Sequence, residues 1–194
     1  TAASGPLRAR YGTMRDLLVG LTVVRGDGTV VKGGGRVVKN VTGYDIPKLH
    51  VGALGTLGVV VEAHLRLHPR PAEERSWIFG FASAEAALEA ALDIRDSPVV
   101  LSRCQLLTSS ALRALGESMP PDGALAVTIG SVPAAVSFQG EGIAEICLRA
   151  GSTAIEVPEA DAWWRRVTDV TWPEDPATAL SLRIGTRPSG VVKA

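Results

Sequence analysis

Glycine is concentrated between residues 33 and 71, and this stretch constrains the chain more than any other. Residues 33–35 read GGG, and residues 52–58 read GALGTLG directly before an apolar run at residues 59–61. Glycine reaches positive φ without a Cβ clash, so both runs predict tight turns. Between them, residues 39–45 read KNVTGYD, and polar side chains on irregular backbone often fix a loop or touch a ligand. We interpret the stretch as backbone kept free of side chains so that a large ligand can lie against it.

Several motifs in a fixed order carry a resemblance to a known family. They are RYGTMRD at residues 10–16, GDG at 26–28, KNVTGYD at 39–45 and GALGTLGVV at 52–60. Together they resemble the second half of the FAD-binding domain of the vanillyl-alcohol oxidase family, the PCMH-type FAD-linked oxidases. Within that family, KNVTGYD and GALGTLG are most similar to the FAD-binding subunit of bacterial glycolate oxidase. One glycine pair alone would be weak evidence for the family. Four motifs in this order and at these separations would rarely match the family by chance.

The resemblance implies an α+β fold in two parts. Residues 1–71 are expected to form the C-terminal part of a PCMH-type FAD-binding domain, and residues 72–194 an incomplete α/β cap of ferredoxin-like type. The half of the flavin domain that grips the FAD pyrophosphate is expected to precede this chain. The proline-rich HPRP at residues 68–71 marks the boundary, because proline stiffens the backbone and cannot donate to a strand ladder.

The resemblance also implies which residues contact FAD. They are Gly5, Arg10, Tyr11, Gly12, Arg15, Lys39, Asn40, Tyr44, Gly55, Gly58, Val59 and Val60. Each has a plainer alternative. The glycines can serve turn geometry alone, the polar residues of KNVTGYD can lock their own loop, and the arginines can be solvated surface charges. The related catalytic D-2-hydroxy-acid dehydrogenases usually carry a glutamate in the loop where Leu54 stands, and this departure points to the companion subunit rather than to an independent oxidase. No catalytic residue is identified, because no histidine has the sequence context of a base and the arginines are unplaced.

Composition bounds the remaining possibilities. The chain has 194 residues, with 20 Lys and Arg against 20 Asp and Glu, so its net charge makes no case for nucleic acid or an anionic membrane. Cys104 and Cys147 are too few for a disulfide framework and indicate a reducing compartment. His50, His64 and His68 share no metal spacing. No apolar run approaches the roughly 20 residues of a bilayer span. We expect a cytoplasmic protein, either free or peripheral to the inner face of the plasma membrane.

Local patterns predict the secondary structure. Residues 17–24 and 28–32 are β-rich and flank an Asp-Gly turn, the strongest short-range signal for a hairpin. Residues 59–67 predict a strand that is buried at its start and half exposed at its end. Residues 44–49 predict a short helical turn with Pro47 at an early position.

Beyond residue 71, strands and helices alternate. Strands are predicted at residues 76–82, 99–107, 124–129, 152–157 and 179–185, and helices at 83–93, 134–149 and 161–167. Ser83 is the expected N-cap of the first helix. The succession β-α-β-β-α-β predicts a ferredoxin-like layer with helices on one side of an antiparallel sheet. Trp163 and Trp164 belong either to the core or to a partner surface.

Two functions from different classes fit the sequence. The first is an FAD-binding subunit of an oxidase or dehydrogenase complex for glycolate or another small 2-hydroxy acid. Its partners would be an FAD-linked catalytic subunit and an iron–sulfur subunit. The second is a structural or interaction subunit that keeps the flavin-domain fold without binding FAD.

Overall fold

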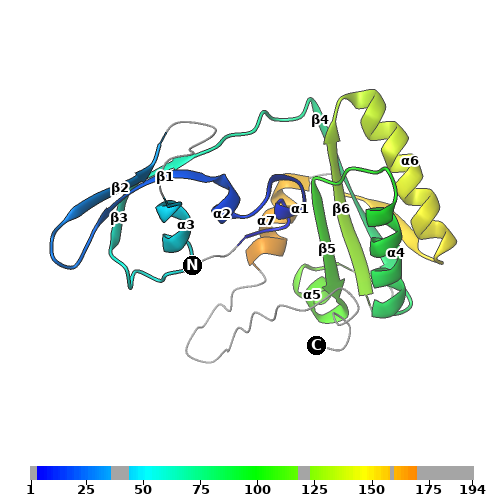
Figure 1. The fold of residues 1–194 in the computed structure, drawn as a ribbon. Coiled ribbons are helices and arrows are strands. Elements are labelled where there is room, and N and C mark those ends of the chain that lie inside the picture. The colour runs from blue at the N-terminus through cyan, green and yellow to red at the C-terminus, as the bar shows by residue number, and fades with distance from the viewer. Residues whose placement is uncertain (1–3, 36–43, 118–122, 158–159, 170–194) are drawn as a thin grey trace. The chain divides into compact units, whose positions relative to one another are not determined.

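The computed structural model describes residues 4–35, 44–117, 123–157 and 160–169 (Figure 1). The chain divides into two compact units, Thr1–Arg70 and Pro71–Ala194. The sequence places the boundary one residue later, after Pro71. Each unit is described by itself.

The first unit is built on a three-stranded antiparallel sheet of order β2-β1-β3. Its elements are α1 (Arg8–Tyr11), α2 (Met14–Leu17), β1 (Leu18–Val24), β2 (Val30–Gly34), α3 (Ile46–His50) and β3 (Val59–Leu65). The predicted hairpin is confirmed, since β1 and β2 pair from Val24↔Val30 to Gly20↔Gly34. Its turn is closed by Gly28, whose N–H donates to the Arg25 carbonyl at 2.9 Å and whose φ is 80°.

A small apolar cluster of Leu18, Leu21, Val23 and Val51 forms the core of this unit. Helix α3 lies against β1 and β2, and a Cβ on Gly33 would come within 3.0 Å of the Cβ of Ile46. The predicted helical turn around Pro47 is confirmed, and this proline is buried.

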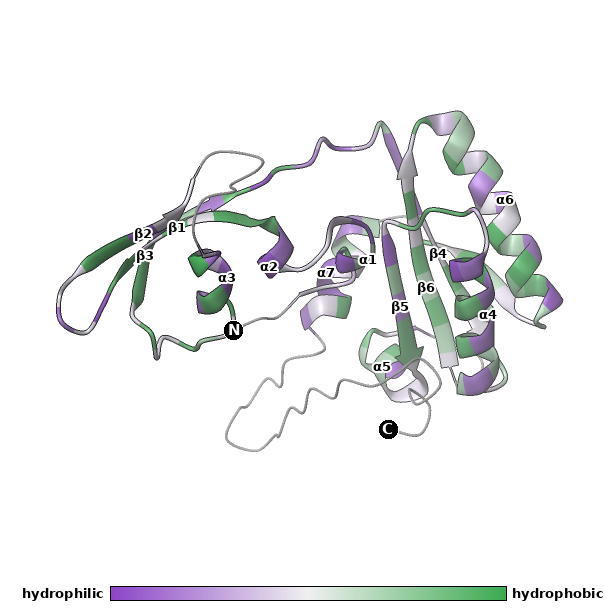
Figure 2. Cartoon of the chain, in the orientation of Figure 1, coloured by the Kyte–Doolittle hydropathy of each residue, from purple (hydrophilic) through white to green (hydrophobic). Residues whose placement is uncertain are grey.

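The predicted burial at the start of β3 is wrong. Val59, Val60 and Val61 are 67%, 49% and 58% exposed. Strand β3 lies at the edge of the sheet, where its register against β1 shifts between Thr22 and Val23, and α3 packs mainly on β1 and β2 rather than on β3. Figure 2 shows β3 as a largely hydrophobic strand, so hydrophobic side chains line an open edge.

The second unit contains a four-stranded antiparallel sheet of order β5-β6-β4-β7. The strands are β4 (Glu73–Phe81), β5 (Arg103–Thr108), β6 (Gly123–Ser131) and β7 (Thr153–Glu156). Helices α4 (Ala84–Asp96) and α6 (Pro133–Arg149) cover one face over a core that includes Phe79, Leu125 and Ile143. The Ser83 hydroxyl accepts from the Ala86 N–H at 3.1 Å, as predicted for an N-cap. Element succession and strand order together confirm the ferredoxin-like prediction.

The opposite face of this sheet is also covered, so the prediction of a single helical layer is wrong. Helices α5 (Ser109–Ala114) and α7 (Ala160–Asp169) supply the residues that pack there. Trp163 and Trp164 are 3% and 4% exposed, which places both in the core. The predicted strand at residues 99–107 begins only at Arg103, and the one at residues 179–185 lies outside the described residues.

Candidate functional site

The loop between α3 and β3, residues 52–58, has an unusual backbone. Gly52, Gly55 and Gly58 adopt φ of 87°, 82° and 137°, and Leu54 adopts a φ of 51°. Positive φ is common for glycine but uncommon for leucine, whose Cβ crowds the backbone there. Leu54 was not predicted in this conformation. The only feature of the sequence that indicates this conformation is the position of Leu54 between Gly52 and Gly55.

This loop is held by its own hydrogen bonds. The N–H groups of Ala53, Thr56 and Gly58 donate to the carbonyls of His50, Ala53 and Gly55, at 3.2, 3.0 and 3.3 Å. The Leu54 and Gly55 N–H groups make no hydrogen bond to any of the described residues. Successive backbone N–H groups in a mixed right- and left-handed turn can form a concave site for an anion or an oxygen acceptor.

Gly55 and Gly58 differ in what surrounds them. A Cβ on Gly58 would lie 2.6 Å from the Val24 carbonyl oxygen and 2.7 Å from Cγ1 of Val23. Gly58 is therefore required by the packing of its own unit. A Cβ on Gly55 would meet no atom within 4 Å. A side chain at Gly55 would therefore project into open surroundings, as it also would at the turn glycines Gly28, Gly116 and Gly151.

Exposed apolar side chains occur on the same loop and on the strand that follows it. Leu54 is 74% exposed and Leu57 43%, and they precede the exposed Val59 and Val60 of β3. Together the loop and the start of β3 offer bare backbone beside an apolar surface. This combination suits a flat ligand with both hydrogen-bonding and hydrophobic edges.

The second group of predicted residues lies around α1 and α2. Gly12 has a φ of 81° and links these helices. The Thr13 backbone N–H and hydroxyl both donate to Asp16 Oδ2, at 2.7 and 2.6 Å, so the Asp16 carboxylate caps the start of α2. These hydrogen bonds lower the pKa of the Asp16 carboxyl, and the bond from the Thr13 side chain has the larger effect. The Tyr11 ring contacts His68, with ring centroids 4.9 Å apart.

Helix α3 connects the two groups of predicted residues. Arg15 Nη1 donates to the Lys48 carbonyl at 3.2 Å, and two residues further on the His50 carbonyl accepts from the loop at Ala53. Lys48 is itself paired with Asp45, and hydrogen bonding to Lys48 lowers the pKa of the Asp45 carboxyl.

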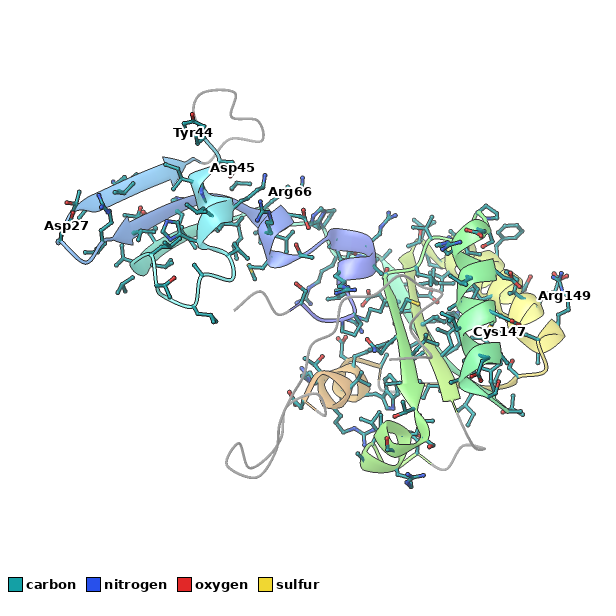
Figure 3. All side chains as sticks on the ribbon, turned by 60° about the horizontal axis from the view of Figure 1, so that its bottom comes forward. Asp27, Tyr44, Asp45, Arg66, Cys147 and Arg149 are labelled. Carbon is teal, nitrogen blue, oxygen red and sulfur yellow. The ribbon has the colours of Figure 1, made fainter. Side chains whose placement is uncertain are left out.

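The remaining predicted residues do not join these groups. Tyr44 is 94% exposed and projects from the chain (Figure 3). Gly5 lies before α1, where its carbonyl accepts from the Arg8 N–H at 3.1 Å. Lys39 and Asn40 lie outside the described residues. The described residues include no group of three or more His, Cys, Asp or Glu that could hold a metal, and none of their helices is long and apolar enough to cross a membrane.

Comparison with curated proteins confirms the resemblance predicted from the motifs. The chain is 39% identical over 115 residues to the mitochondrial D-lactate dehydrogenase [cytochrome] of Arabidopsis thaliana, a match covering 59% of this chain and 20% of that protein. It is 34% identical over 110 residues to glycolate oxidase subunit GlcD of Bacillus subtilis, covering 56% of this chain and 23% of the relative. It is 39% identical over 68 residues to subunit GlcE of Escherichia coli, covering 35% and 19%. The chain thus spans about a fifth of the length of the curated relatives it matches. No protein-family model matches the chain.

Solved structures confirm the predicted fold. Alkyldihydroxyacetonephosphate synthase aligns with 88% of this chain and 34% of its own, at a TM-score of 0.67 and 19% identity. p-Cresol methylhydroxylase aligns with 78% of this chain and 37% of its own, at a TM-score of 0.59 and 14% identity. At these identities the likeness establishes the fold alone. The chain has the α+β, PCMH-type fold, and its sequence relatives are glycolate oxidase subunits and D-2-hydroxy-acid dehydrogenases.

Proposed function

We propose that this chain contributes FAD contacts to a 2-hydroxy-acid oxidoreductase of the glycolate oxidase type. One observation carries the proposal, namely the open space at Gly55 beside the unbonded N–H groups of Leu54 and Gly55. The names of the sequence relatives supply the reaction class, since they act as D-lactate dehydrogenases, D-2-hydroxyglutarate dehydrogenases and glycolate oxidase subunits.

In this proposal each group of site residues has a separate role. The N–H groups at Leu54 and Gly55 would donate to oxygen acceptors of the cofactor. Val59 and Val60 would cover its apolar surface and exclude water, and Arg10 and Arg15 would balance its negative charge. Bound FAD would supply the two-electron redox chemistry, while the protein supplies orientation and electrostatics.

Substrate oxidation is assigned to another subunit. Removing a proton from a 2-hydroxy acid requires a general base, and its carboxylate requires a cation. Of the three described histidines of the first unit, His50, His64 and His68, His64 Nε2 lies 3.6 Å from Glu62 Oε1 and His68 contacts Tyr11. We assign the role of base to none of them. We therefore place this chain beside an FAD-linked catalytic subunit and an iron–sulfur subunit. We assign the complex to the cytoplasm, free or at the inner face of the plasma membrane.

The visible spectrum of the protein purified from its complete reading frame tests the proposal. Bound flavin gives absorbance bands at about 370 and 450 nm. Gly55→Val should abolish these bands, because its side chain would fill the open space. Gly116→Val serves as the matched control, since Gly116 also has positive φ (77°) and open surroundings but lies in the second unit. A colourless, folded wild-type protein would instead support the structural subunit that binds no FAD. The leucine at position 54 favours this second candidate.

A further inference from the structure

The chain is neutral overall, but its two units carry opposite net charges. The first unit, residues 1–70, holds ten Lys and Arg but four Asp and Glu, for a net charge of about +6. The second unit, residues 71–194, holds ten Lys and Arg but sixteen Asp and Glu, for a net charge of about −6. Such a separation creates fields of opposite sign on the two units.

The positive charge of the first unit includes a surface of arginines that have no carboxylate partner. The contact of Tyr11 with His68 places α1 beside residues 66–70, and the Arg66 N–H donates to the Leu17 carbonyl of α2 at 2.8 Å. This arginine surface consists of Arg8, Arg10, Arg15, Arg66 and Arg70, all of them exposed. Among the described residues, none of the five has a carboxylate oxygen within 4.0 Å.

The side chains next to these arginines are those of a protein interface. Leu67 is 87% exposed, and Leu7 and Met14 are each 41% exposed. Arginine, tyrosine and methionine are enriched at protein interfaces, whereas lysine, glutamate and aspartate are depleted. The arginine surface itself contains no lysine. Its composition favours a protein partner with carboxylates over a purely electrostatic contact with a lipid surface.

A matching acidic surface occurs on the second unit. Glu85, Glu89, Asp93 and Asp96 follow one another along α4 at intervals of four, four and three residues, so they share one face of the helix. All four are exposed, as are Glu141 and Glu145 of the neighbouring α6. Among the described residues, Asp96 and Glu145 have a salt-bridge partner, Arg95 and Arg149 respectively, whereas the other four have none.

We propose that two copies of this chain associate through these surfaces, with the arginine surface of one copy against the α4–α6 acidic face of the other. Unlike surfaces form a heterologous contact, which closes into a ring or extends, depending on the rotation between copies. Arg10 and Arg15 of this surface are also proposed cofactor contacts, so the test of association is placed on other arginines. Arg8 and Arg66, which carry this test, lie outside the predicted cofactor contacts.

Sedimentation velocity at low and high ionic strength tests the proposal on the whole chain. At low salt the protein should sediment above its monomer mass of 20.3 kDa. It should return to the monomer in about 0.5 M salt, where charges on exposed surfaces are screened. Arg8→Glu/Arg66→Glu should sediment as a monomer at low salt. Arg113→Glu, a charge reversal at an exposed arginine of α5, is the control and should associate like the wild type.

A charge swap makes the test specific to the two surfaces. Glu89→Lys/Asp93→Lys alone should also be monomeric, and mixing it with Arg8→Glu/Arg66→Glu should restore association. A wild-type monomer at low salt would overturn the proposal. It would also be overturned by association that survives both double reversals, or by a mixture that stays monomeric. Circular dichroism of each variant establishes that the reversals leave the fold intact.

Discussion

Gly58 lies against the backbone of Val24, so closely that a Cβ at Gly58 would come within 2.6 Å of the Val24 carbonyl oxygen. Gly58 is the last residue of the loop that carries the candidate site and directly precedes β3. Only glycine can make this close contact where the loop enters the strand. Gly58 also has a φ of 137°, a conformation open to few residues other than glycine.

We predict that Gly58→Ala destabilises the first unit more than Gly55→Ala. Positive φ alone costs a non-glycine residue about 1–2 kcal/mol, and at Gly58 the contact with Val24 adds to this cost. Hydrogen exchange of β1 and β3 measures the effect, because all four tryptophans lie in the second unit and do not report on the first. Equal acceleration of exchange in the two variants would contradict the contact at Gly58.

Features with strong local signals could be predicted from the sequence. The Asp-Gly turn specifies the β1–β2 hairpin, and Ser83 specifies the start of α4, because each depends on neighbouring residues only. The ferredoxin-like order followed from the succession of elements, since chain connectivity leaves few ways to arrange such a unit.

Features that depend on distant parts of the chain could not be predicted. An apolar run such as Val59–Val61 has the same pattern whether it is buried or lies at an open edge. The covering of the second sheet face depends on α7, which follows β4 by some 80 residues and docks through the bond from Trp164 Nε1 to Ser76 Oγ. The left-handed Leu54 opposes the intrinsic preference of leucine, so only the structure reveals it.

The two glycines within α6 give a second, paired prediction. A Cβ on Gly140 would lie 3.0 Å from the Trp77 ring, whereas one on Gly142 would have only Val99 Cγ2, at 3.8 Å. Alanine is favoured over glycine in a helix interior by about 1 kcal/mol. Gly142→Ala should therefore stabilise the second unit by up to about 1 kcal/mol, and Gly140→Ala should be less stable than Gly142→Ala. Urea unfolding followed by tryptophan fluorescence gives the order, and the reverse order would contradict it.

The attachment of α7 gives a third prediction. The indole N–H of Trp164 donates to Ser76 Oγ at 3.0 Å, and that hydroxyl is also 2.7 Å from Oγ1 of Thr128. Trp164→Phe keeps most of the ring but removes the donor, so it should cost about 1 kcal/mol of unfolding free energy. A double-mutant cycle with Ser76→Ala isolates the bond. A coupling energy of zero would show that this bond does not help to hold α7 on the sheet.

The last prediction concerns the two thiols of the second unit and the effect of alkaline pH. Burial, followed by the nearby Cys104, raises the pKa of the Cys147 thiol to about 12, and burial raises the pKa of Cys104. Both thiols should stay protonated and unreactive toward an alkylating reagent at pH 8, because the thiolate is the nucleophile. Unfolding in urea should expose two reactive groups.

These raised pKa values make the stability of the second unit depend on pH with a definite sign. The thiol of an unfolded cysteine has a pKa of about 8.5. Above that pH the unfolded chain therefore loses protons that the native state retains. Stability is therefore fully present below about pH 8.5 and falls as the pH rises toward the folded pKa of Cys147, about 12. The urea midpoint of the wild type should fall between pH 8 and pH 10, and the fall should be smaller in Cys147→Ala, whatever the absolute stability of that variant. Equal falls in the two proteins would show that Cys147 does not titrate differently on folding.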